Sequence, residues 1–178
     1  MMQLLARFRV ALAWVCAPLV LVLANPSIES IFVGTIVALA GEALRIWAAG
    51  HLNKSREVTS SGPYRFLAHP LYIGSSVIGV GVGVASANPI AAALVIFYLA
   101  ITLRAAINSE EAFLRRTFGE QYELYKQQRR VDRTRRFSLQ LAMANREYRA
   151  LVGLFAGLLL LALKATYNGS FWRIGVGP

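Results

Sequence analysis

The sequence has little of the chemistry that most soluble enzymes use. Its 178 residues include one cysteine, two histidines and nine acidic residues. The single cysteine, Cys16, excludes a disulfide within the chain. The two histidines, His51 and His69, stand far apart, and no group of Cys, His and carboxylates has the spacing of metal ligands. We therefore expect no metal site.

Apolar residues, by contrast, are in excess. They make up 56% of the chain, and the mean hydropathy is +0.49. A helix needs about 20 residues to cross the hydrocarbon of a bilayer. The sequence predicts an all-α integral membrane protein, one membrane domain over residues 1–178 with two polar connections at 51–70 and 108–149. Its five transmembrane helices are expected at about 10–24, 31–50, 71–87, 89–107 and 150–167, with the third and fourth forming a tight hairpin turned at Asn88-Pro89.

The basic residues are distributed unevenly among the connections. Seventeen of the 19 fall before the first segment, between the second and third, or between the fourth and fifth, and two fall elsewhere. Because cytoplasmic loops carry the excess of Lys and Arg, we expect the N-terminus, 51–70 and 108–149 in the cytoplasm. The densest run, "RRVDRTRR" at 129–136, predicts contact with anionic lipid headgroups. Nucleic acid is not an expected partner, since no aromatic platform accompanies the charge.

The N-terminus has a second interpretation. Arg7 and Arg9 precede an apolar run that ends in "VLA" at 22–24, a pattern that also fits a cleaved signal peptide. Cleavage would remove the first segment and leave the orientation of the others unchanged.

The stretch "GPYRFLAHPLYIG" at 62–74 gathers polar and aromatic residues where the third segment begins. Pro70 suits the first turn of a helix, which places His69 at the helix start beside free backbone N–H groups. Nearby lie Tyr64, Arg65 and Tyr72. This set suits a ligand with a carboxylate, an aromatic base and a positive centre. An interfacial aromatic belt with a snorkelling arginine would produce the same pattern.

Glycines are dense in the third segment, at Gly74, Gly79, Gly81 and Gly83. Small residues allow membrane helices to pack closely. Glycine also lets a ligand approach the backbone. The sequence leaves both interpretations open.

Residues 108–126 are expected to continue the helix of the fourth segment past the membrane surface, and a carboxylate interrupts the apolar stripe of this helix. Glu111 shares its helical face with Leu103, Ile107, Leu114 and Phe118. An acidic side chain on such a face needs a partner. Arg115, four residues on, would form a simple structural pair. The adjacent Glu110 points about 100° away, so we expect it to have a different role.

Two motifs together carry a resemblance to a known family. "VTSSGPYRFLAHPLYIG" is followed some forty residues later by "EEAFLRRTFGEQYELYK". The chain resembles the isoprenylcysteine carboxyl methyltransferases, which belong with the phospholipid methyltransferases. Their pattern is roughly G-P-Y-R-x-x-R-H-P-x-Y-x-G and then E-E-x-x-L-x-x-x-F-G-x-x-Y-x-x-Y. The resemblance covers about residues 40–126, including "LRIWAAGHLNK" upstream.

The chain departs from that pattern at two points. Ala68 stands where the family has an arginine before the histidine, and Arg65 would substitute for it only in part. After Tyr125, the basic run and a further apolar helix replace the family's proline-containing close. Both departures concern the methyl acceptor more than the cofactor.

The resemblance implies S-adenosylmethionine as methyl donor and a lipophilic methyl acceptor. It implies cofactor-binding roles for Tyr64, His69, Tyr72, Gly74, Glu110 and Glu111. Catalytic roles fall to Glu111 and Arg65, and contacts with the acceptor to Tyr122, Tyr125 and Arg129. The acceptor would be the carboxylate of a prenylated cysteine or a small lipophilic substitute.

Three other functions remain open at this stage. The first is N-methylation of a phospholipid or other amine, in which Glu110 or Glu111 would take the proton. The second is a membrane reductase that uses a nicotinamide cofactor, because sterol reductases are similar in fold to this family. The third is a non-catalytic membrane scaffold that binds lipid. Binding of S-adenosylmethionine separates the methyltransferases from the other two.

Overall fold

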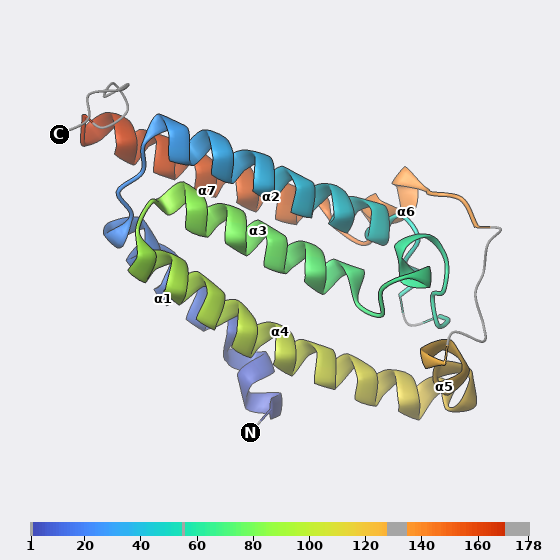
Figure 1. Ribbon diagram of the computed structural model, residues 1–178. Coiled ribbons are helices and arrows are strands. Elements are labelled where there is room, and N and C mark those ends of the chain that lie inside the picture. Colours follow the sequence, from blue (N-terminus) through green and yellow to red (C-terminus); the bar gives the residue numbers. More distant parts are fainter. Residues whose placement is uncertain (1, 55, 128–134, 170–178) are drawn as a thin grey trace.

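The computed structural model describes residues 2–54, 56–127 and 135–169, and helices are its regular elements (Figure 1). They are α1 (Met2–Leu23), α2 (Ile28–Ala49), the 3₁₀ helix η1 (Gly62–Arg65), α3 (Pro70–Ser86), α4 (Pro89–Phe118), α5 (Glu120–Lys126), α6 (Leu139–Ala144) and α7 (Tyr148–Tyr167). No strand occurs in these ranges, which confirms the all-α fold.

Each of the five predicted apolar segments is a helix in the structure. By length and composition, α2, α4 and α7 are able to cross a membrane. The apolar part of α1, Ala11–Leu23, and helix α3 are shorter. Three candidate spans are thus present, and five crossings stay a prediction.

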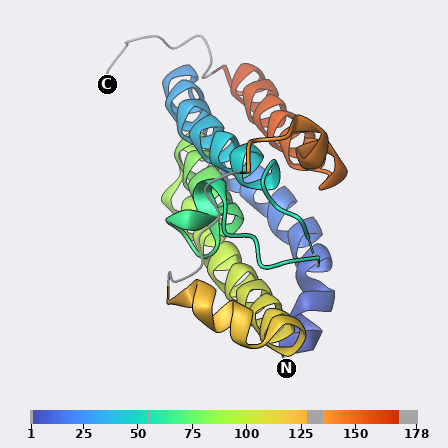
Figure 2. The ribbon, with the colours of Figure 1, turned by 90° about the vertical axis from the view of Figure 1, so that its right-hand side faces the viewer.

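The helices form one layer with two more helices packed on one side of it. Helices α2, α3 and α4 lie next to one another in the layer, and α7 packs against α2 and α3 while α1 packs against α4 (Figures 1 and 2). The connecting segment 50–69, η1, α5 and α6 all lie at one end of the helices, away from the α3–α4 turn (Figure 1). The polar elements are therefore gathered at a single end.

The closest helix contact in the layer joins α2 to α3 through small residues. A Cβ added at Gly81 would lie 2.5 Å from the backbone nitrogen of Ala38 and 2.6 Å from the carbonyl oxygen of Gly34. One added at Gly74 would lie 2.7 Å from the carbonyl oxygen of Gly41. The glycines of α3 therefore serve close packing of helices, the first of the two interpretations left open by the sequence.

Side-chain caps fix where two of the helices begin. Ser27 and Ser30 exchange hydrogen bonds in a capping box at the start of α2. Asn88 accepts hydrogen bonds from the backbone N–H groups of Ile90 and Ala91 at the start of α4. Asn88 and Pro89 thus make the tight α3–α4 turn that the sequence predicts.

One predicted helix is wrong in its extent. We expected 108–126 to continue the fourth helix without a break, but α4 ends at Phe118. Gly119 has φ +46°, a backbone conformation that glycine adopts without steric cost. The chain turns there, and α5 brings Tyr122 and Tyr125 back toward the start of α3.

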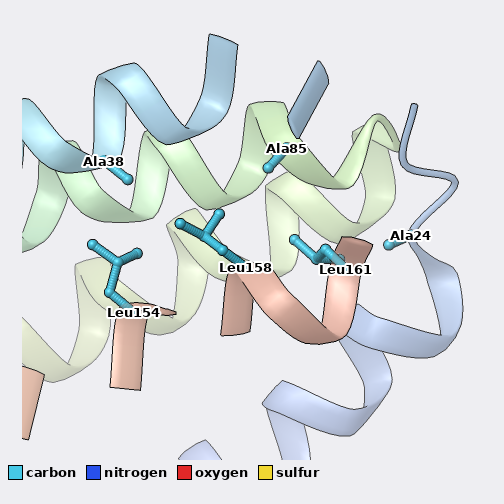
Figure 3. Packing of buried hydrophobic residues seen from close by; sticks show 6 residues of the cluster. All are labelled: Ala24, Ala38, Ala85, Leu154, Leu158 and Leu161. Atoms are coloured by element: carbon cyan, nitrogen blue, oxygen red, sulfur yellow. The ribbon is translucent and has the colours of Figure 1, made fainter. Parts of the chain in front are cut away.

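Helix α7 completes the core by packing on the layer of α2, α3 and α4. Its Leu154, Leu158 and Leu161 pack with alanines from three other elements: Ala24, Ala38 and Ala85 (Figure 3). At the far end of α7, Lys164 Nζ donates hydrogen bonds to the carbonyl oxygens of Leu21 (2.7 Å) and Val22 (2.6 Å). These carbonyls lie in the last turn of α1 and need such donors.

The α2–α3 contact yields a stability prediction. Replacing Gly81 with Ala should lower the free energy of unfolding by about 1–3 kcal/mol, because the added Cβ meets backbone atoms that cannot rotate away. Thermal unfolding of the purified protein in detergent measures the effect. The matched control is Gly157→Ala in α7, where a Cβ meets nothing within 4 Å. Equal midpoints for the two variants would contradict the close-packing role.

Candidate active site

The site begins where the connecting segment enters α3. Pro63 and Tyr64 are buried within η1, and Pro70 occupies the first turn of α3 as predicted. His69 is the N-cap residue of α3, but its side chain makes no capping hydrogen bond. Its ring is therefore available to a partner outside the helix.

That partner is Glu111. His69 Nε2 lies 3.2 Å from Glu111 Oε1, so residues 42 positions apart meet across the open end of the α3–α4 hairpin. Glu111 Oε2 lies 3.4 Å from both Arg115 and Lys126. The structural pair with Arg115 is thus present. Of the three contacts of Glu111 it contributes the least stability, because Arg115 is the most exposed of the three partners.

The apolar stripe of α4 faces inward as expected. Glu111 and the four apolar members of the stripe are all partly buried, whereas most residues between them on α4 are exposed. The four apolar members are Leu103, Ile107, Leu114 and Phe118. The carboxylate of Glu111, whose side chain is 23% exposed, therefore lies at the edge of the interior with three partners.

Helix α5 closes the site through its two tyrosines. The Tyr125 hydroxyl donates to the carbonyl oxygens of Tyr64 (2.9 Å) and Leu67 (3.4 Å). Burial, with the charge of Glu110 as the second cause, raises the pKa of Tyr125 to about 12 and the pKa of Tyr64 above its ordinary value. Both phenols therefore stay protonated at neutral pH, and the carboxylate of Glu110 acts on this same region.

Two cavities adjoin this contact, and Tyr125 lines both. The larger has a volume of about 250 Å³ and is lined by Glu57, Val58, Ser60, Ser61, Gln121, Tyr125 and Arg135. The smaller has about 60 Å³ and is lined by Tyr64, Arg65, Phe66, Leu67, Ala68, Tyr125 and Lys126. The smaller cavity lies between 64–68 and α5, and neither cavity is lined by His69 or Glu111.

Two buried hydroxyls near the cavities have no hydrogen-bond partner among the described residues. They are Ser61 Oγ, in a residue that is 1% exposed and lines the larger cavity, and Tyr122 Oη. Burial and the nearby charge of Glu111 raise the pKa of Tyr122 to about 12. A buried hydroxyl without a partner costs about 1–3 kcal/mol. Ser61 Oγ, which lines the larger cavity, is therefore able to bond a polar atom of a ligand, whereas Tyr122 lines neither cavity.

The structure brings most of the predicted site residues to one end of the helices. The ring of Tyr72 packs 5.8 Å from that of His69, and Arg65 lies in the wall of the smaller cavity. Gly74, in contrast, turns toward α2 and Arg45. The hydroxyl of Tyr125 holds the connecting segment. The cofactor, catalytic and acceptor roles of all these residues, Gly74 and Tyr125 included, stay predictions.

Part of the basic run lies outside the described residues. Arg129 is among the residues left out, so its contact with the acceptor stays a prediction. Arg135 is described and forms an ion pair with Glu57 beside the larger cavity. Binding of anionic headgroups by 129–136 likewise stays a prediction. In the described ranges no three His, Cys, Asp or Glu residues gather as metal ligands would.

Sequence reasoning missed a buried charge cluster behind α3. Arg45 Nε lies 2.6 Å from Glu147 Oε1, and Arg45 also donates to Ser75 Oγ. Glu42, which is 1% exposed, lies 3.7 Å from Arg45. The spacing of Glu42 and Arg45 on one helix face is visible in the sequence, but the partner Glu147 is 102 residues away from Arg45. The cluster ties α2, α3 and the start of α7 together.

Comparisons with known proteins show the family to which the chain belongs. The family described as phospholipid methyltransferase matches residues 28–121, which is more than half of the chain and includes His69 and Glu111. The chain therefore belongs to the phospholipid methyltransferase family, a family of membrane methyltransferases, and is an integral membrane protein.

Curated relatives match over part of their length. The chain is 31% identical over 108 residues to the probable protein-S-isoprenylcysteine O-methyltransferase of Oryza sativa subsp. japonica, covering 54% of this chain and 56% of that protein. It is 35% identical over 89 residues to the nickel-cobalt-cadmium resistance protein NccN of Alcaligenes xylosoxydans xylosoxydans, covering 49% of this chain and 40% of that protein. The chain thus spans about half the length of these relatives. No solved structure is significantly similar.

The Tyr125 contact yields a second prediction. Tyr125→Phe should lower the free energy of unfolding by about 1 kcal/mol, because it leaves the buried carbonyl oxygen of Tyr64 without this donor. Thermal unfolding measures the loss. Tyr167→Phe is the matched control, since Tyr167 is 91% exposed and should lose nothing. A Tyr125→Phe variant as stable as this control would contradict the contact.

Proposed function

We propose that this protein is an S-adenosylmethionine-dependent methyltransferase that acts on a lipid-like acceptor. The first acceptors to test are the carboxylate of a prenylated cysteine and small lipophilic substitutes for it. The observation that carries the proposal is the contact between the two family motifs, His69 Nε2 at 3.2 Å from Glu111 Oε1. A cavity of about 250 Å³, lined by Tyr125, lies at the same end of the helices. The distribution of basic residues favours a cytoplasmic position for this end of the molecule and for the N-terminus.

The residues present fit the cofactor. Small-molecule pockets occupy about 300–1,000 Å³, so the larger cavity has room for part of the cofactor, such as its nucleoside. Its wall offers the hydroxyl of Ser61, which has no partner in the described ranges, and the amide of Gln121. These groups match ribose hydroxyls and the edge of an adenine ring. Glu111 offers a carboxylate to the positively charged part of the cofactor.

Most of the catalytic work would then be alignment and exclusion of water. When bound, S-adenosylmethionine supplies a methyl group on a positively charged sulfur. His69 and Glu111 fix the two helix ends between which donor and acceptor must meet. The buried tyrosines Tyr64 and Tyr125 keep water from this region. If the acceptor is a carboxylate, opposite charges are neutralised during transfer, which a dry site favours over the hydrated ions.

A second candidate is N-methylation of a phospholipid or other amine. The observation that favours it is the position of Glu110, whose charge acts on both Tyr64 and Tyr125. An amine must lose a proton before or during methylation, and a carboxylate at this position would accept it.

The direct test is methyl transfer by the full chain in lipid nanodiscs. The protein is incubated with S-adenosylmethionine that carries a radiolabelled methyl group and with three acceptors: N-acetyl-S-farnesylcysteine, phosphatidylethanolamine and a lipophilic thiol. Label in a base-labile ester of the prenylcysteine supports the proposal, and label in the lipid amine supports the second candidate. A protein that binds no S-adenosylmethionine and labels no acceptor contradicts both.

Replacing the two residues at the centre of the site should weaken cofactor binding. We expect Glu111→Gln and His69→Ala each to reduce the affinity for S-adenosylmethionine tenfold or more in calorimetry, since each removes half of the contact that fixes the site. The control Glu120→Gln changes an exposed carboxylate that contacts neither residue, and should leave the affinity within threefold. Affinities of all three variants equal to that of the unaltered protein would contradict the assigned roles.

A further inference from the structure

The smaller cavity has positive charge in its wall and no acidic residue to balance it. Two of its lining residues, Arg65 and Lys126, are basic, and none is acidic. At about 60 Å³ the cavity is about a quarter of the size of the larger one. We expect a space of this size to take a small charged group.

Of the two basic residues, Arg65 is the one without a carboxylate partner among the described residues. Its Nε donates to the carbonyl oxygen of Gly62 at 3.3 Å, and its guanidinium lies 5.1 Å from the centre of the Phe66 ring. Within the described ranges it makes no ion pair with a carboxylate. A guanidinium presents its N–H groups in a fork that matches the two oxygens of a carboxylate.

Lys126 reaches the same cavity from a different element. Its Nζ lies 3.4 Å from Glu111 Oε2 and 5.8 Å from the centre of the Tyr122 ring. Glu111 also contacts His69, and Arg115 pairs with both Glu111 and Glu123, the latter at 3.3 Å. Lys126 therefore shares its carboxylate with other groups, and the wall of the cavity itself holds two basic residues and no acidic one.

At position 68 this chain lacks a basic residue that the related motif has, and Lys126 of α5 lies beside that position. The motif that this chain resembles has an arginine directly before the histidine, and here that residue is Ala68. Ala68 and Lys126 line the same small cavity, although they are 58 positions apart. A longer side chain at position 68 would therefore start from the lining of the cavity that Lys126 also lines.

We propose that Arg65 and Lys126 form a carboxylate-binding subsite in this cavity, and that Lys126 supplies the cation that Ala68 lacks. The subsite rests on the proposed function, because it adjoins Tyr125 and the larger cavity assigned to the nucleoside. The carboxylate has two possible sources, the amino-acid end of the cofactor and the methyl acceptor. Both present the same planar anion to the two cations.

The test removes the charge of Lys126 and keeps its length. Lys126→Met should reduce the affinity for S-adenosylmethionine tenfold or more and leave the affinity for decarboxylated S-adenosylmethionine within threefold, if the cofactor supplies the carboxylate. If the acceptor supplies it, cofactor affinity stays within threefold and the KM for N-acetyl-S-farnesylcysteine rises tenfold or more. Arg115→Met is the matched control, since Arg115 also pairs with Glu111 but does not line the cavity.

A compensating change keeps the test independent of folding. Adding Ala68→Arg to Lys126→Met should restore the lost affinity or the lost KM to within threefold of the unaltered protein, because Ala68 is exposed and opens on the same cavity. The conservative variant Lys126→Arg should retain both quantities.

The outcomes separate this inference from the proposed function. A protein that binds the cofactor equally well with and without the Lys126 charge, and whose KM for the acceptor is also unchanged, overturns the subsite alone. Loss of binding in Lys126→Met that Ala68→Arg does not restore overturns the compensation by Lys126. An unaltered protein that binds neither form of the cofactor overturns the proposed function and the subsite with it.

Discussion

The contact between His69 and Glu111 is the constraint on which the site depends. It joins the N-cap residue of α3 to the second half of α4, so the α3–α4 hairpin is closed at both ends, by Asn88–Pro89 and by this pair. Pro70 makes it possible, because it starts the helix immediately after His69 and leaves the ring outside. Glu111 is equally constrained, since an acidic side chain on an inward-facing stripe needs a partner.

Further contacts hold the surrounding elements to this pair. Tyr125 fixes the connecting segment from α5, and Arg45 links α2 to Glu147 at the start of α7. Asn145, after α6, donates to the carbonyl oxygens of Ala49 and Leu52 at 2.9 and 2.8 Å, where α2 ends. Helices α6 and α7 lie outside the region matched by the family, yet they cap and pair with residues inside it. They thus complete the support beneath the site.

Much of the fold could be predicted, because the length of an apolar run and the residues that begin or end a helix are local properties of the sequence. Runs of apolar residues gave the five helices, Pro70 gave the start of α3, and the stripe around Glu111 gave the inward face of α4. The break at Gly119 was not predicted, since a glycine inside a helical pattern is compatible with a continuous helix at a modest cost.

The site was predictable only in its outline. The family motifs identified His69 and Glu111, but not that they contact each other directly and leave the larger volume beside Ser61 and Gln121. Lys126 was missed because its relation to Ala68 depends on how α5 turns after α4. Such contacts between distant residues depend on packing, which periodicity along the chain does not record.

Hydrogen–deuterium exchange of the full chain, with and without saturating S-adenosylhomocysteine, tests the location of the site most directly. We predict slower amide exchange at 59–68 and at 120–126, the two segments that line the cavities on either side of Tyr125. The loop at 24–27, at the opposite end of the helices, should be unaffected (Figure 1). Unchanged exchange in both cavity-lining segments, or protection confined to the opposite end, would contradict a cofactor site at this end of the molecule.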